Sequence, residues 1–138
     1  MKQKLFLYRG VPGSGKTYQA SHNPNIDFHF EADDYFWLDG QPFGAFEYCF
    51  DPERLPDAHK HCLWRTMQAL QKGYSVGVAN TFTRIWEMQQ YLDFAKDNDI
   101  EVVVIRCTGE YENVHNIPAA KVKQMKDRFE DYEGEILV

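Results

Sequence analysis

Short apolar runs alternate with longer segments of helical periodicity along this chain. The apolar runs predict β-strands at residues 4–9, 26–30, 75–79, 101–107 and 135–138. Between them, apolar residues recur at helical spacing, which predicts helices at residues 16–22, 52–72, 85–98 and from 118 onward. The run 102–105 is continuously apolar, as is typical of a parallel strand covered on both faces. We therefore expect an α/β fold with helices on both faces of a parallel sheet of four or five strands.

The segment 37–51 interrupts this alternation. It contains Gly40, Pro42 and Gly44 together with five aromatic residues. Glycine and proline favour turns, whereas aromatic side chains favour burial. We expect an ordered surface loop that packs on the rest of the chain, and Asp51 before Pro52 is a typical start for the helix that follows it.

The composition fits one domain, residues 1–138. Of its residues, 43% are hydrophobic and 15% aromatic, which is enough to build a core without metal or disulfide support. The cysteines Cys49, Cys62 and Cys107 form no CxxC pair, so we expect neither a disulfide framework nor a zinc site. With no leader and no membrane-spanning run, a cytoplasmic location is expected, in the host cytoplasm if the chain is encoded by a phage. The net charge of −6 limits any nucleic-acid contact to a local one.

One segment carries a phosphate-binding signature between a predicted strand and a predicted helix. It matches G-x-x-x-x-G-K-[ST], and its candidate nucleotide-binding residues are Gly10, Val11, Pro12, Gly13, Ser14, Gly15, Lys16 and Thr17. Backbone N–H groups of such a loop surround the phosphates. Lys16 would reach the β- and γ-phosphates, and the Thr17 hydroxyl would bind Mg²⁺. The motif predicts a three-layer P-loop fold that binds ATP with Mg²⁺, although ATP and GTP are not distinguished.

The remaining acids discriminate between the reactions that use a P-loop. No guanine-reading Asn-Lys-x-Asp is present, and the strands ending at Ala79 and Arg106 carry no acid at their tips. Asp33 and Asp34 instead follow the second strand, which we expect to lie beside the P-loop strand. There Asp33 would be the general base for an attacking hydroxyl and a candidate metal ligand, and Asp34 would orient Asp33 or a magnesium-bound water. The alternative is that either aspartate caps the following turn.

The sequence resembles polynucleotide-kinase-like P-loop proteins, which include phage polynucleotide kinases and the kinase domains of ubiquitin-ligase-binding proteins. The resemblance covers nearly the whole chain. It is carried by the P-loop, Ala32-Asp33-Asp34-Tyr35-Phe36, Asp39-Gly40, Phe50-Asp51-Pro52, Ala58-His59, Asn80-Thr81 and Trp86-Glu87-Met88, and by His115-Asn116-Ile117-Pro118 and 125–130. It implies ATP-dependent phosphorylation of a hydroxyl, typically a nucleic-acid 5′-OH, with Asp33 as general base and a lid at about 108–120.

Three departures from that family concern its charged residues. Members that act on nucleic-acid ends have an arginine at the position of Phe36, often an aspartate at that of Asn80, and an arginine in the lid, whereas residues 111–118 contain none. Other residues could contact a substrate or belong to the lid, namely Asp34, Asn80, Arg84, Arg106, His115 and Lys121.

Three functions are therefore compatible with the sequence. The first is a P-loop kinase that phosphorylates a nucleic-acid end, a modified base or a nucleoside. The second is a nucleotide-binding protein with weakened transfer that acts through a protein partner. The third is a small-molecule kinase, because related folds change acceptors by changing loops.

Overall fold

A parallel sheet of five strands organises the chain, in the order β2-β3-β1-β4-β5. The computed structural model describes residues 2–38, 48, 50–111 and 117–138. The strands are β1 (Lys4–Arg9), β2 (Phe28–Phe30), β3 (Val76–Ala79), β4 (Glu101–Arg106) and β5 (Ile136–Leu137). The α-helices are α1 (Lys16–Ser21), α2 (Tyr35–Leu38), α3 (Leu55–Gln71), α4 (Gln89–Asp97) and α5 (Ala119–Arg128). Three 3₁₀ turns, η1 (Ala32–Asp34), η2 (Pro52–Arg54) and η3 (Ile85–Met88), precede α2, α3 and α4.

The predicted α/β fold with a parallel sheet is confirmed. The long helix at 52–72 begins as η2, where the side chain of Asp51 accepts a hydrogen bond from the Glu53 amide at 3.0 Å, as its predicted capping role requires. The short helix α2 was not predicted, because it occupies the start of the aromatic-rich loop. In the described part of the chain, no helix is long and apolar enough to cross a membrane.

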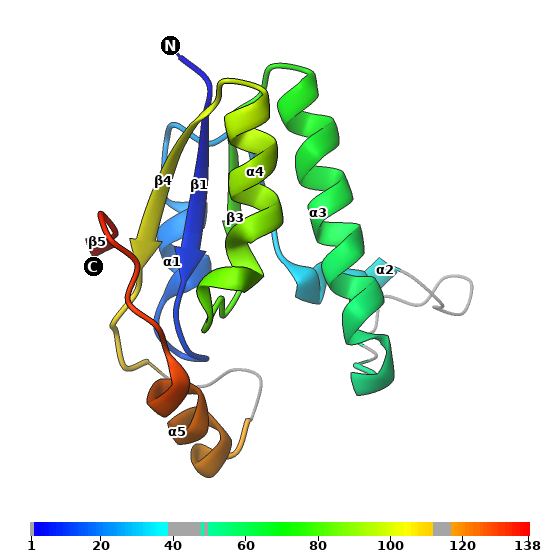
Figure 1. The fold of residues 1–138 in the computed structure, drawn as a ribbon. Helices are drawn as coiled ribbons and strands as arrows, with labels where there is room; N and C mark the ends of the chain where they lie inside the picture. Colours follow the sequence, from blue (N-terminus) through cyan, green and yellow to red (C-terminus); the bar gives the residue numbers. More distant parts are fainter. Residues whose placement is uncertain (1, 39–47, 49, 112–116) are drawn as a thin grey trace.

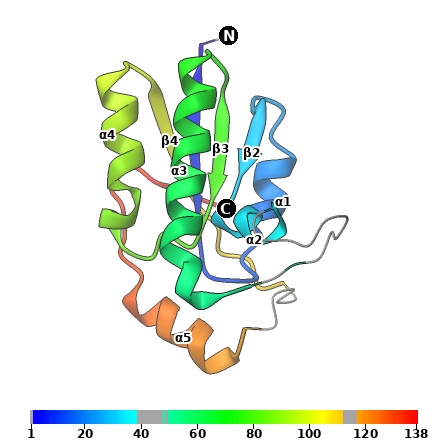
Figure 2. The ribbon, with the colours of Figure 1, turned by 90° about the vertical axis from the view of Figure 1, so that its right-hand side faces the viewer.

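Helices cover both faces of the sheet, which gives three layers (Figures 1 and 2). Alternate residues of β1 point to opposite faces. Leu5 and Leu7 belong to the core cluster that includes the inner residues of α3 and α4, whereas Phe6 and Tyr8 pack in a second cluster with Ala20 of α1. Because β1 is buried on both faces, it is the centre of the domain.

The position of β2 corrects one expectation. The strand before Asp33 does not lie beside the P-loop strand, because β3 pairs with β1 on one side and with β2 on the other. Every residue of β3 is buried, whereas Phe28 of β2 is 42% exposed. Strands that are apolar along their whole length are typical of the interior of a parallel sheet, where both faces are covered. This explains why β3 takes the inner position and β2 the edge.

The C-terminal segment is fastened to the sheet by two arginines and one aromatic ring. The guanidinium carbons of Arg9 and Arg106 each lie 4.4 Å from the centre of the Phe129 ring. Glu135 accepts from Arg9 at 2.9 Å and lies 3.4 Å from Arg106. We call Arg9, Arg106, Phe129 and Glu135 the C-terminal clamp. It holds the chain beyond α5 against the end of β1.

Arg9 makes the clamp energetically important. Its side chain is fully buried and also donates to the Phe82 carbonyl at 2.7 Å. Removing one partner of a buried ion pair costs about 3–5 kcal/mol, whereas an exposed pair such as Lys123–Asp127 contributes about 0–1 kcal/mol. The clamp pair therefore outweighs the surface pairs.

We expect Glu135→Ala to lower the free energy of unfolding by about 3 kcal/mol, because it leaves the buried charge of Arg9 without its carboxylate. Chemical denaturation followed by circular dichroism measures this change. The matched control is Glu133→Ala, at an exposed position in the same turn, which should change the free energy by less than about 0.5 kcal/mol. Equal effects of the two substitutions would contradict the assigned role of the clamp.

Candidate functional site

The P-loop follows β1 at the carboxyl edge of the sheet. Gly13 and Gly15 have positive φ angles of 82° and 95°, a backbone region that other residues rarely adopt. The Gly10 amide donates to the Thr81 carbonyl at 3.1 Å, which ties the loop to the end of β3. The loop is thus held by its own turn and by the neighbouring strand.

Lys16 is enclosed by this loop. Its ammonium group donates to the Val11 carbonyl at 3.1 Å. Burial lowers the pKa of Lys16 below its usual value, and the nearby Glu31 carboxylate opposes this shift. A half-buried ammonium that donates to a backbone carbonyl favours an anionic ligand, such as a phosphate, at this point.

Thr17 contacts an acid that the sequence reasoning missed. Its hydroxyl donates to Glu31 Oε2 at 2.9 Å, and His29 Nε2 lies 2.8 Å from the same oxygen. Burial raises the pKa of Glu31, but hydrogen bonds from His29 and Thr17 and the charge of Lys16 outweigh it, so the pKa is lowered. The signal for Glu31 in the sequence is an acid directly after a strand, which is ambiguous because Asp33 and Asp34 follow within three residues.

The two predicted aspartates separate in the structure. Asp33 accepts a hydrogen bond from the Tyr48 hydroxyl. Asp34 accepts from the Glu31 amide at 2.9 Å and pairs with Arg65 of α3 at 3.3 Å. Asp34 therefore caps η1, which is the capping alternative considered from the sequence, whereas Asp33 keeps its proposed role as a prediction.

An aromatic cluster adjoins Asp33 and consists of Phe36, Trp37, Tyr48 and Phe50. The ring centres of Trp37 and Tyr48 are 5.3 Å apart, and those of Phe36 and Phe50 are 5.1 Å apart. The predicted packing of the aromatic-rich loop holds for Tyr48 and Phe50, while residues 39–47 and 49 lie outside the described part. Burial and the hydrogen bond to Asp33 raise the pKa of Tyr48, so its phenol remains a proton donor.

The remaining candidate residues are already paired with protein groups. The side chain of Asn80 accepts from the Ala32 amide at 2.9 Å. Arg84 lies 3.8 Å from Glu130, and Arg106 belongs to the C-terminal clamp and also contacts Asp131. His115 lies outside the described residues. Substrate contacts by these side chains stay predictions.

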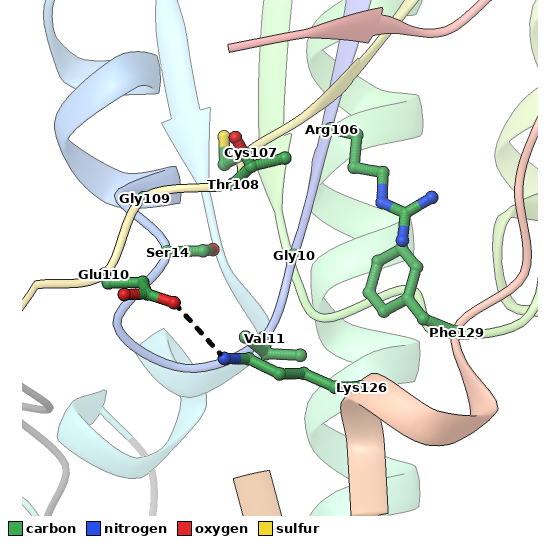
Figure 3. A pocket seen from close by; sticks show the side chains of 10 residues that line it. All are labelled: Gly10, Val11, Ser14, Arg106, Cys107, Thr108, Gly109, Glu110, Lys126 and Phe129. Atoms are coloured by element: carbon green, nitrogen blue, oxygen red, sulfur yellow. Dashed lines mark ion pairs between the residues drawn. The ribbon is translucent and has the colours of Figure 1, made fainter. Parts of the chain in front are cut away.

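Part of the predicted lid lies against the P-loop. The Gly109 amide donates to the Ser14 carbonyl at 3.1 Å, and the Tyr111 amide donates to the Gly13 carbonyl at 2.7 Å. A cavity of about 270 Å³ lies beside these contacts, between the P-loop, the end of β4 and α5 (Figure 3). Its residues are Gly10, Val11, Ser14, Arg106, Cys107, Thr108, Gly109, Glu110, Lys126 and Phe129.

Lys126 is the lysine that the structure brings to this cavity. Its ammonium group lies 3.9 Å from Glu110, and it also lines a second cavity of about 410 Å³ over Gly13 and Tyr111. Lys121, which we singled out from the sequence, lines neither cavity. Both lysines lie in one polar helix. The sequence therefore does not show which of them faces the P-loop, because this depends on the rotation of α5 about its axis.

The donor set around Thr17 fits magnesium. Within residues 2–38, 48, 50–111 and 117–138, no three histidine, cysteine or acidic side chains form a metal-binding group. Mg²⁺ is typically bound through one or two protein oxygens together with phosphates and water. The Thr17 hydroxyl and the Glu31 carboxylate could provide such a partial site.

No protein-family model matches the sequence. Human NEDD4-binding protein 2 is 28% identical over 142 residues, which cover 93% of this chain but 8% of that protein. Among solved structures, the Mycobacterium tuberculosis APS kinase CysC, in complex with AMPPNP and APS, matches 89% of this chain and 68% of its own, with a TM-score of 0.57 and 13% identity. The Pnkp1/Rnl/Hen1 complex contains a chain that matches 89% of this one and 38% of its own, with a TM-score of 0.58 and 15% identity.

The chain has the fold of the P-loop kinases. Its resemblance to polynucleotide-kinase-like P-loop proteins, first indicated by the sequence motifs, is confirmed. At these identities the solved structures establish the P-loop kinase fold of this chain and not its acceptor.

We expect Gly109→Ala to weaken binding of AMPPNP by about 10-fold, which equals about 1.4 kcal/mol. A Cβ at this position would lie 2.4 Å from the Tyr111 ring and 2.9 Å from the Ser14 carbonyl, so the P-loop or the lid segment must shift. Isothermal titration calorimetry measures the affinity.

The control for this variant is Gly73→Ala at the end of α3. A Cβ at Gly73 meets no atom within 4 Å, although its φ of +91° makes the substitution strained. This variant should lower stability and leave nucleotide affinity unchanged. If Gly109→Ala bound AMPPNP as the wild type does, contact between the lid segment and the P-loop would not matter for binding.

Proposed function

We propose that this protein is an ATP-dependent kinase that transfers the γ-phosphoryl group to a hydroxyl of a nucleic-acid end, a modified base or a nucleoside. The observation that carries the proposal is the placement of a P-loop, with Lys16 and Thr17, beside a turn that presents two separate carboxylates. Glu31 accepts from Thr17, and Asp33 accepts from a hydroxyl. One carboxylate that accepts from the P-loop threonine and another that accepts from a separate hydroxyl suit phosphoryl transfer better than simple nucleotide storage.

The P-loop residues Gly10 to Thr17 would bind the phosphates of ATP through their backbone amides and Lys16. The Thr17 hydroxyl, near Glu31, would hold Mg²⁺ together with phosphate oxygens. Bound Mg²⁺ would neutralise charge on the β- and γ-phosphate oxygens. The cavity between the P-loop and α5 would take the nucleoside part, with Lys126 and the lid residues Thr108–Tyr111 around it.

Asp33 would act as the general base. Its carboxylate accepts the proton of the acceptor hydroxyl while the acceptor oxygen forms a bond to the γ-phosphorus. The bond from that phosphorus to the β–γ bridging oxygen breaks, and ADP leaves. The Tyr48 hydroxyl already donates a hydrogen bond to Asp33. This contact supports a hydroxyl as the acceptor group whose proton Asp33 would take.

The aromatic cluster favours an acceptor with a planar ring. Trp37 and Phe50 are 47% and 51% exposed beside Asp33, and exposed aromatic side chains stack on nucleobases. The net charge of −6 disfavours a long duplex, so a single-stranded end or a nucleoside fits better. This choice of acceptor is part of the proposal.

A second candidate is a nucleotide-binding protein that acts through a protein partner. Arg84 and Arg106, which the sequence offers as candidate substrate or lid residues, are engaged with Glu130 and with Asp131 and Glu135. If they keep those partners in the nucleotide-bound protein, transfer would be slow. A lack of transfer to any acceptor, with tight ATP binding, would favour this candidate.

We expect Asp33→Asn to reduce phosphoryl transfer by at least about 10²-fold, because the amide cannot accept the proton. Its ATP affinity should stay within about twofold of the wild-type value, whereas Lys16→Ala should weaken both binding and transfer. The assay follows the γ-phosphate of labelled ATP onto 5′-OH DNA, 5′-OH RNA, hydroxymethyluracil-containing DNA and nucleosides.

The matched control is Asp97→Asn, at an exposed position in α4, which should transfer phosphate as the wild type does. Equal transfer by Asp33→Asn and the wild type would remove Asp33 as the base. Label on 5′-OH DNA or RNA but not on nucleosides, with no additional label on hydroxymethyluracil-containing DNA, would restrict the acceptor to an end.

A further inference from the structure

Two side chains, Thr17 and His29, approach a single oxygen of Glu31. Thr17 Oγ1 is 2.9 Å from Glu31 Oε2, and His29 Nε2 is 2.8 Å from the same atom. The Glu31 side chain is 18% exposed, whereas Thr17 is exposed, so the hydroxyl lies where a nucleotide and a metal could reach it. Such an arrangement restricts the orientation of the carboxylate, because a hydrogen bond from α1 and an ion-pair contact from β2 converge on one oxygen.

The backbone that carries Glu31 is fixed as well. The Glu31 amide donates to Asp34 Oδ2 at 2.9 Å, and the next amide, of Ala32, donates to Asn80 Oδ1 at 2.9 Å. Asn80 follows β3, the strand between β2 and the P-loop strand. The turn after β2 is therefore pinned to the strand beside it, which holds Glu31 against Thr17.

A hydroxyl has one proton and two lone pairs. With its proton donated to Glu31, the Thr17 hydroxyl has its lone pairs free to act as a metal ligand. The tip of β3 carries Ala79 and Asn80 and supplies no acid, so Glu31 is the carboxylate that approaches this hydroxyl. A negative charge next to the ligand also favours a divalent cation.

We propose that Glu31 is the acid of the magnesium–nucleotide site, which orients the Thr17 hydroxyl toward the metal and is itself positioned by His29. The inference rests on the proposed binding of ATP with Mg²⁺ and assigns the metal role to Glu31 in place of Asp33. The two acids have different partners, Thr17 for Glu31 and Tyr48 for Asp33. Glu31 is thus a positioning residue for the metal, and Asp33 serves the acceptor.

The geometry makes Glu31 the acceptor that this role requires, because the Thr17 hydroxyl donates to its Oε2 at 2.9 Å. Its charge also repels the phosphates of a nucleotide that carries no metal.

The test uses the full chain and two binding measurements. Electron paramagnetic resonance gives the affinity of Mn²⁺ for the protein–ATP complex, and calorimetry gives the affinity of ATP in the presence of EDTA. We expect Glu31→Gln to weaken Mn²⁺ binding by about 10-fold or more. ATP binding in EDTA should stay unchanged or become tighter, because a repulsive charge is removed.

Glu101→Gln is the control, since it removes one acidic charge from the start of β4, at the opposite edge of the sheet, and should change neither affinity. If Glu31→Gln merely disturbed the fold, it would weaken the binding of Mn²⁺ and the binding of ATP in EDTA together. That result would overturn the inference. Unchanged Mn²⁺ affinity would overturn it too.

A double-mutant cycle tests the route through Thr17. In a Thr17→Ala background, Glu31→Gln should cause a clearly smaller loss of Mn²⁺ affinity than in the wild type, because the hydroxyl that Glu31 orients is absent and only the effect of its charge remains. Additive losses would show that Glu31 acts independently of Thr17 and would overturn the positioning role. Failure of the kinase proposal can be distinguished from failure of this inference. If no acceptor is phosphorylated, a selective loss of Mn²⁺ affinity in Glu31→Gln still supports the metal role.

Discussion

The parallel pairing of β1 with β3 and β4 is the constraint on which the rest of this structure depends. Leu5, for example, is paired with Val76 on one side and with Val102 on the other. Parallel strands in such a register end at a common edge, and the loops that follow them meet there. The P-loop, the turn after β2 and the segment after β4 are brought together by this register and not by their order in the sequence. The helices on both faces make it rigid, since they bury alternate residues of β1.

Charge at this edge is divided among separate partners. Lys16 lies in the P-loop, Glu31 contacts Thr17, Asp33 contacts Tyr48 and Asp34 contacts Arg65. Neighbouring acids in a turn of four residues therefore have different electrostatic surroundings, and this lets them serve different steps. Conversely, the arginines at the same edge are occupied by the C-terminal clamp and its surroundings. The cations available to a bound nucleotide are thus mainly lysines, which bind phosphate as point charges and not through a bidentate fork.

The C-terminal segment links the site to the stability of the domain. Arg9 ends the strand that leads into the P-loop, and its guanidinium is held by Glu135 and by the carbonyl of Phe82. The same clamp orients α5, whose Lys126 faces the P-loop cavity. A buried ion pair stabilises a structure only when both partners stay in place. The position of α5 therefore depends on the buried guanidinium of Arg9, which contacts Phe129 directly after this helix. The site is thereby coupled to the fold through the C-terminal clamp.

The sequence by itself determined the fold class, the strands, the P-loop and the two aspartates after the second strand. These features depend on local periodicity and on a motif of fixed spacing, which are properties of neighbouring residues. Four features depend on the tertiary structure. They are the neighbour of the P-loop strand, the contact of Glu31 with Thr17, the capping role of Asp34 and the position of Lys126 at the P-loop cavity. Each of them depends on side chains that are far apart in the sequence or on which face of a polar helix turns inward. A carboxylate directly after a strand is ambiguous in sequence, because only the packing of β3 between β1 and β2 brings Glu31 to the hydroxyl of Thr17.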